Sequence, residues 1–190
     1  MTTFLAPIVR LAASRRLSHV AGLVFVDPIE EDAAVLFSAQ FRRRERVALR
    51  VGTALARLGL LRFLFGSLLA AAPSDDVRED LRREAFTVGL LQTQARQARG
   101  YLDELQTWKA NPPGAEDTPI TVISGGLARA AGGMPQHARD EATAAHVRRA
   151  AWSASGRHVI ARNSGHTAPL TEPQVIADEV ARPRQYRHLG

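Results

Sequence analysis

The sequence predicts an α/β protein built on about three parallel strands, with flanking helices and one long helical insertion. Three short apolar runs support this prediction: HVAGLVFVDP at 19–28, PITVISGG at 119–126 and GRHVIARNSGH at 156–166. Runs that are apolar on both faces are typical of buried parallel strands. Helical patterns alternate with these runs, and such an alternation predicts a parallel sheet covered by helices.

Helices are predicted next to these strands. Residues 5–16 place apolar side chains at helical spacing and end in two arginines, which suit a helix C-terminus. Residues 135–153 mix polar and apolar positions at helical spacing. The segment 171–181 opens with Thr171 as the expected N-cap and Pro173 in the first turn. These segments complete the alternation of helices and strands.

The region between the first two strands, 29–110, contains no convincing strand. Its pattern predicts helices over about 30–50, 52–71 and 75–108. The loop NPPGAEDTP at 111–119, with three prolines and a glycine, then ends the helical pattern. The chain therefore carries a helical insertion within its α/β core.

Composition limits the class of protein. The 190 residues are 45% hydrophobic, which suffices for the core of one domain. The absence of cysteine excludes disulfides and thiolate metal sites, and it predicts a cytoplasmic location. The most apolar segment, 58–72, contains Arg62 and is too short to cross a membrane, and the N-terminus has no signal-peptide pattern. We expect no membrane association.

The net charge of +6 raises the question of an anionic partner. The basic residues are spread over most of the chain, and Lys109 is the only lysine. We interpret the densest cluster, 41–50, as a solvated helix face, so nucleic acid is not the expected partner. The alternative left open is a non-enzymatic binding protein that uses the arginine-rich helices 41–50 and 78–83 on an anionic partner such as nucleic acid.

Polar residues stand where the predicted strands end. Functional residues of parallel α/β sheets collect at the carboxyl ends of the strands. Those ends here are Asp27 in FVDP, the glycines of ISGG, and His166 in NSGH. An acid and a histidine at neighbouring strand ends are two members of a nucleophile–histidine–acid triad, in which the acid orients the imidazole and the imidazole takes a hydroxyl proton.

Plainer interpretations stay open for these residues. His166 can be an ordinary loop histidine, and Asp27 can end its strand through side-chain turn bonds before Pro28. The other five histidines share no metal-binding spacing, so we expect no metal. The glycines after the second strand match neither a phosphate-binding loop nor a dinucleotide fingerprint, and we expect no cofactor.

The same pieces resemble the C-terminal part of an α/β-hydrolase. VAGLVFVDP is similar to the sixth strand of many members, which ends in VDP. PITVISGG is similar to the seventh strand, and the strand leading to SGH, with the helix EPQVIADEV after it, is similar to the last strand and its histidine loop. The resemblance covers most of residues 8–181 and includes a helical cap between the first two pieces.

The resemblance implies a role for each of the two residues. His166 takes the place of the family's general base. Asp27 takes the place of the acid that follows the sixth strand in some members, because ISGGLARAAGG carries no carboxylate near its strand end and Asp117 precedes its strand. The family's nucleophile motif, G-x-S-x-G, matches no window of this sequence. Thr3 falls near the nucleophile's position, but no strand precedes it, so we assign no nucleophile.

In a full-length form, the resemblance implies that a serine attacks an ester or related acyl carbon while His166 acts as base and then as acid. The expected substrate is a small hydrophobic ester, since the cap offers apolar side chains for a pocket. The chain as given is expected to be inactive because it lacks the nucleophile, which leaves its status as an enzyme open.

The predicted domain organisation follows from the resemblance to α/β-hydrolases. Residues 1–28 and 111–182 form a partial hydrolase core, 29–110 form the cap, and 183–190 form a flexible tail. A three-strand remnant leaves VAGLVFV at a sheet edge. Unpaired apolar edges invite pairing with other chains, so we expect self-association through this edge.

Overall fold

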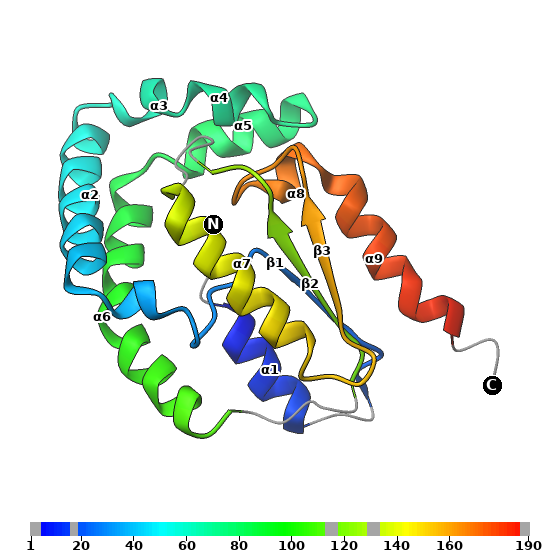
Figure 1. The fold of residues 1–190 in the computed structure, drawn as a ribbon. Helices are drawn as coiled ribbons and strands as arrows, with labels where there is room; N and C mark the ends of the chain where they lie inside the picture. The colour runs from blue at the N-terminus through cyan, green and yellow to red at the C-terminus, as the bar shows by residue number, and fades with distance from the viewer. Residues whose placement is uncertain (1–4, 16–18, 113–117, 129–133, 187–190) are drawn as a thin grey trace. The chain divides into compact units, whose positions relative to one another are not determined.

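A computed structural model of the chain describes residues 5–15, 19–112, 118–128 and 134–186 (Figure 1). The part of the chain so described contains a three-stranded parallel sheet flanked by helices, which confirms the mixed α/β class. The strands lie in the order β1-β2-β3, and each is shorter than its apolar run. They are β1 (Leu23–Val26), β2 (Ile120–Gly125) and β3 (Arg157–Ala161).

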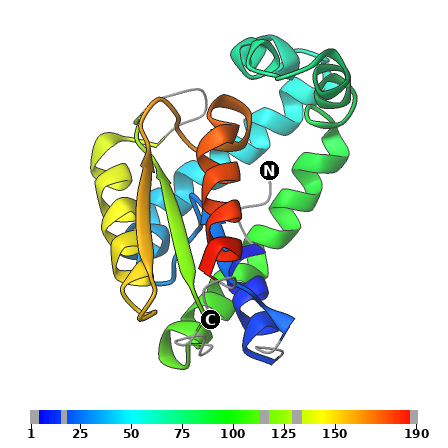
Figure 2. The same cartoon turned by 90° about the vertical axis from the view of Figure 1, so that its right-hand side faces the viewer.

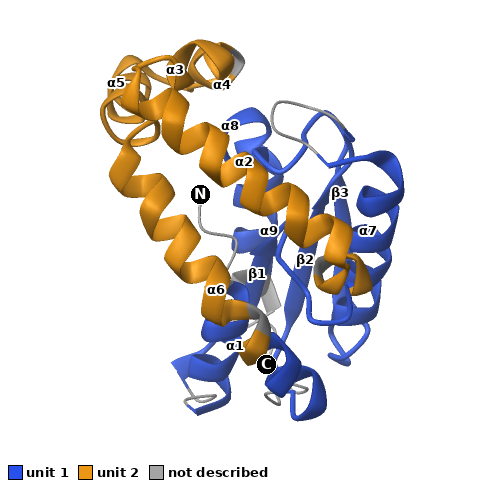
Figure 3. Ribbon diagram, turned by 90° about the vertical axis from the view of Figure 1, so that its left-hand side faces the viewer, with its two compact units in different colours: residues 1–33, 105–190 blue, residues 34–104 orange. Residues whose placement is uncertain are grey.

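The chain divides into two compact units, residues 1–33 with 105–190 and residues 34–104 (Figure 3). The first unit contains the sheet. The second consists of helices, and its limits lie a few residues inside the insertion 29–110 that the sequence suggests. We describe each unit by itself.

The sheet of the first unit is covered on both faces. Figures 1 and 2 show α7 (Gln136–Ala150) and α9 (Pro173–Tyr186) on opposite faces. Alternate side chains of the strands point to these two layers, as the pleat of a sheet requires. One layer adds α1 (Leu5–Arg15), and the other adds the short α8 (Ala168–Thr171). The first layer buries Ala13, Leu23, Phe25, Ile120, Val122 and Ala150, and the second buries Ile123, Ala161 and Ala168.

A cluster of four buried charges joins α1, α7 and the segment after β1. Arg10 binds Glu31 through two hydrogen bonds of 2.9 and 2.6 Å, and Arg149 binds Glu30 at 2.7 Å and also Glu31. All four side chains are almost fully buried. Burial raises the pKa of Glu30 to about 7 against the opposing effect of the arginines, whereas Arg10 and Arg149 outweigh burial at Glu31 and lower its pKa. We call these residues the ion-pair cluster.

The second unit is helical, as the sequence predicts, but the predicted break between helices at 50–52 is wrong. Helix α2 (Ala39–Arg57) runs through it and ends where Gly59 adopts φ 68°. The Gly59 N–H donates to the Ala56 carbonyl at 3.1 Å and the Leu60 N–H to the Leu55 carbonyl at 2.9 Å. This is a Schellman ending, which needs a residue that tolerates positive φ. The remaining elements are η2 (Ala34–Phe37), α3 (Leu61–Leu64), α4 (Gly66–Ala70), α5 (Asp75–Glu84) and α6 (Val88–Ala110).

The C-terminal helix also differs from its prediction. Thr171 is the last residue of α8 and not an N-cap. Its hydroxyl donates back to the Thr167 carbonyl, at 3.2 Å. Helix α9 begins at Pro173 and continues to Tyr186, into the segment that the sequence assigned to a tail. None of the helices among the described residues is long and apolar enough to cross a bilayer.

Candidate functional site

The structure brings Asp27 and His166 together at the carboxyl edge of the sheet. Asp27 follows β1 and His166 follows β3, and the Nδ1 of His166 donates to Oδ2 of Asp27 at 2.8 Å. The two strands are not neighbours, because β2 lies between them. The Asp27 carboxylate therefore reaches across the end of β2, where its Oδ1 accepts the Gly125 N–H at 3.1 Å.

The backbone of Asp27 turns sharply to make this reach possible. Its φ is 45°, in the left-handed region that aspartate tolerates better than most residues. The Asp27 N–H still donates to the Ile123 carbonyl at 2.7 Å, so the strand pairing lasts up to the turn. The Asp27 side chain accepts hydrogen bonds from Gly125, Arg139 and His166, which all lie far from it in the sequence.

A buried arginine completes the surroundings of Asp27. Arg139, in the first turn of α7, forms an ion pair with Oδ1 of Asp27, and both side chains are 3% exposed. Burial by itself raises the pKa of Asp27, but the hydrogen bonds and charges of His166 and Arg139 outweigh it and hold that pKa well below its ordinary value. Asp27 is therefore ionised at neutral pH. Sequence reasoning missed Arg139, which matches no motif.

The loop that carries His166 is held at several points. The Leu127 N–H donates to the Ser164 carbonyl at 2.9 Å, and the Ser164 hydroxyl lies 2.5 Å from that of Thr171. Glu172 accepts from the backbone and the side-chain amide of Asn163, at 2.9 and 3.2 Å. The His166 side chain is nevertheless 33% exposed. A fixed but accessible imidazole suits proton transfer.

Gly125 explains how the loop comes so close to β2. A Cβ at this position would overlap the carbonyl group of Gly165. Only glycine leaves room there for the backbone that precedes His166. Gly125, one of the glycines at the end of the second strand, thus has a steric role.

A second polar group lies within the core, and sequence reasoning missed it because its members share no motif. The hydroxyl of Ser124 lies 2.7 Å from Nδ1 of His146 and 2.8 Å from Nε2 of His158. The Nε2 of His146 lies 2.8 Å from the Pro28 carbonyl, which can only accept. Nε2 of His146 must therefore carry a proton, so neutral His146 accepts at Nδ1 from Ser124, which accepts in turn from His158. Burial lowers the pKa of both histidines.

Ser124 is not offered as a nucleophile. It is fully buried, and its hydroxyl is engaged by His146 and His158. Thr3 and Asp117, which the sequence analysis considered, lie outside the described residues. Within the described ranges, no group of three or more histidine and carboxylate side chains could hold a metal ion.

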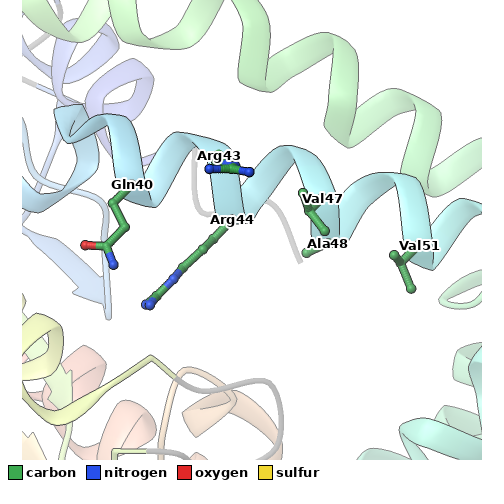
Figure 4. Close-up of a pocket in the computed structure, with 6 residues that line it drawn as sticks. All are labelled: Gln40, Arg43, Arg44, Val47, Ala48 and Val51. Atoms are coloured by element: carbon green, nitrogen blue, oxygen red, sulfur yellow. The ribbon is translucent and has the colours of Figure 1, made fainter.

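The second unit contributes a hollow of about 590 Å³ along α2 (Figure 4). Arg43 and Arg44 lie at one end of it and are exposed, and no ion pair among the described residues involves either. The arginines of α5 differ, since each pairs with an acid three residues earlier. The hollow is lined by Gln40, Arg43, Arg44, Val47, Ala48 and Val51.

Comparison with protein-family models, with curated proteins and with solved structures found no match. The resemblance to α/β-hydrolases thus depends on the residues and motifs of this sequence alone.

Proposed function

We propose that this chain supplies the general base, His166, and the acid, Asp27, of an α/β-hydrolase that cleaves esters or related acyl compounds. The observation that carries the proposal is the 2.8 Å hydrogen bond between Nδ1 of His166 and Oδ2 of Asp27. The partial hydrolase fold belongs to the same proposal, with β1, β2 and β3 as the last three strands and residues 29–110 as the cap.

The chemistry follows from the hydrogen bond. The Asp27 carboxylate fixes the proton of neutral His166 on Nδ1 and leaves Nε2 as the basic nitrogen. Nε2 takes the proton of an attacking hydroxyl, and the nearby carboxylate stabilises the imidazolium that forms. The imidazolium then gives this proton to the leaving alcohol. A water molecule, activated in the same way, releases the acid from the acylated hydroxyl.

The hydroxyl nucleophile of this proposal comes from residues other than these 190, in a longer form of the protein. The sequence contains no G-x-S-x-G window, and the hydroxyl of Ser124, which is bonded to two histidines, is buried. For the 190-residue chain we expect no turnover of activated esters above that of free imidazole.

The experiment begins with the intact mass of the protein purified from its own cells, followed by labelling with a fluorophosphonate probe. A chain about half as large again, labelled on serine, is expected. His166→Ala should abolish labelling, while His137→Ala, an exposed histidine on α7, should leave it unchanged. A mass of 20.7 kDa without labelling, or labelling that survives His166→Ala, would refute the proposal.

A second function is favoured by one observation, the pair Arg43 and Arg44 beside the hollow on α2. Two exposed arginines that pair with no carboxylate in the described part of the chain fit an anionic ligand, of which duplex DNA is a convenient probe. Arg43→Gln with Arg44→Gln should weaken a salt-sensitive interaction. Arg82→Gln with Arg83→Gln removes the same charge from α5, where both arginines are paired, and is the control. Equal binding by both variants would exclude α2 as the site.

A further inference from the structure

Arg139 occupies a place that is costly for an arginine. Its side chain is 3% exposed, and its Nε and Nη2 have no hydrogen-bond partner among the described residues. Buried donors without partners destabilise a fold. Its position in the first turn of α7 also places a cation near the positive end of the helix dipole. The ion pair with Asp27 offsets these costs.

The ion pair changes what Asp27 can do for His166. Oδ1 of Asp27 accepts from Arg139 and from the Gly125 N–H, while Oδ2 accepts from His166. A protonated His166 would thus share its counter-ion with a permanent cation. Arg139 weakens the preference of Asp27 for the imidazolium form, and it keeps the carboxylate ionised so that Nδ1 of the neutral imidazole always has an acceptor.

We propose that Arg139 is a positioning residue that holds Asp27 ionised and limits how strongly Asp27 favours the protonated form of His166. The inference rests on the proposed function only in naming His166 as the base.

Other ionisable groups near this site must be followed at the same time. Asp27 acts on His146, which lies on α7 like Arg139, and His146 in turn interacts with His158 of β3. Arg139 also acts on His146. Because Arg139→Gln also changes the field at His146, the route through Asp27 is read from His166, and a general change of field is read from the exposed His137.

The test is NMR of the histidine ring resonances of the 190-residue chain against pH, in the wild type and in Arg139→Gln. At a fixed pH within the titration, the ratio of protonated to neutral His166 should rise about three- to tenfold in Arg139→Gln, which is a shift of about half to one pH unit. The same ratio for His137, an exposed residue of the same helix, should stay constant. An unchanged His166 in a folded variant, or an equal change at His137, would overturn the inference.

A measurement on the wild-type chain guards against a variant that does not fold. The ¹³C resonance of the Asp27 carboxyl should keep its ionised position down to the pH at which the chain unfolds in acid. Titration of this carboxyl near its ordinary range, in the folded chain, would also overturn the inference. Neither experiment uses catalysis, so a failed labelling experiment with an altered His166 titration would refute the proposed function and leave the role of Arg139 intact.

Discussion

The carboxylate of Asp27 accepts a hydrogen bond from His166, 139 residues further along the chain, at 2.8 Å. The same carboxylate is the counter-ion of buried Arg139. Two cationic or potentially cationic groups thus depend on one acid, and removing that acid leaves a buried guanidinium without compensation.

Asp27→Asn should therefore lower the free energy of unfolding by about 3 kcal/mol, the order expected when a buried ion pair loses one partner. Asparagine tolerates the left-handed backbone at this position, so the loss reports on charge rather than on the turn. Urea unfolding measures it. Asp178→Asn, at an exposed site on α9, is the control and should change stability by less than about 0.5 kcal/mol. A similarly small effect at Asp27 would contradict the structure.

Gly125→Ala should disturb the His166 loop, because the added methyl group overlaps the backbone of Gly165. We expect a loss of about 1–3 kcal/mol, as for other overpacked sites, together with changed chemical shifts for His166. Gly100→Ala, inside α6 where a Cβ meets nothing within 4 Å, should instead stabilise the chain by about 0.5–1 kcal/mol. Equal effects of the two substitutions would show that the close approach is not real.

Arg149→Met should be strongly destabilising, since it leaves Glu30 and Glu31 buried with one arginine between them. The expected loss is about 3–5 kcal/mol. Its neighbour Arg148 is half exposed and lies 3.9 Å from Asp32, so Arg148→Met should cost less than about 1 kcal/mol. Thermal or urea unfolding of the two variants compares a buried with an exposed pair on the same helix.

The histidines bonded to Ser124 should make the fold sensitive to mild acid. Burial lowers the pKa of His146 and His158 in the folded chain below the ordinary 6.5, so the unfolded chain takes up protons first as the pH falls. Their contribution to stability is full above about pH 6.5. It declines below that pH by at most about 1.4 kcal/mol per pH unit for each histidine, until the folded-state pKa is reached.

The measurement is the difference in unfolding free energy between the wild type and His158→Gln from pH 7 to 5. Glu30 has the opposite effect, and taking the difference removes it. Because the pKa of Glu30 is raised, its contribution to stability is full below about pH 4.5 and is lost as the pH rises towards 7. The wild type should lose more stability with acid than the variant. His137→Gln should behave as the wild type, and a His158→Gln curve parallel to both would count against the buried histidine pair.

Self-association is expected at the free edge of β1. The Leu23 N–H donates to the carbonyl of Pro119, just before β2, and the Asp27 N–H donates to Ile123 of β2. The alternate residues Val24 and Val26 therefore direct their backbone groups away from β2. Val24→Pro removes one outward donor without removing a bond to β2, and should lower the association seen by analytical ultracentrifugation. A wild-type chain that stays monomeric at high concentration would argue against an exposed pairing edge.

The sequence was sufficient for features that depend on local pattern. The buried strands follow from their apolar runs, and α1 and α7 from helical spacing. The rule that functional residues collect at the carboxyl ends of strands placed Asp27 and His166 on one edge of the sheet. It did not show that β2 lies between their two strands. The sequence could not show which residues the side chains of α7 bind. Arg139 and His146 lie about two turns apart on the same face of this helix, yet Arg139 binds Asp27 after β1 and His146 binds Ser124 of β2. Buried polar residues of this kind look, in a sequence, like an ordinary solvated helix surface.

The pairing register also dictates an order of assembly. Strands β2 and β3 pair through residues such as Thr121 and Arg157, and the segment between them in sequence contains α7. Leu23 of β1 pairs with Ile120, and the segment between these two residues is much longer. Closing the longer loop costs more chain entropy, and on the ribosome β1 emerges long before its partner. We therefore expect the sheet to grow from its C-terminal side, with β1 as the last strand to dock. Because Asp27 arrives with that strand, the contact between the carboxylate and His166 forms at the end of folding, and its Nδ1 proton is a spectroscopic marker of a completed chain.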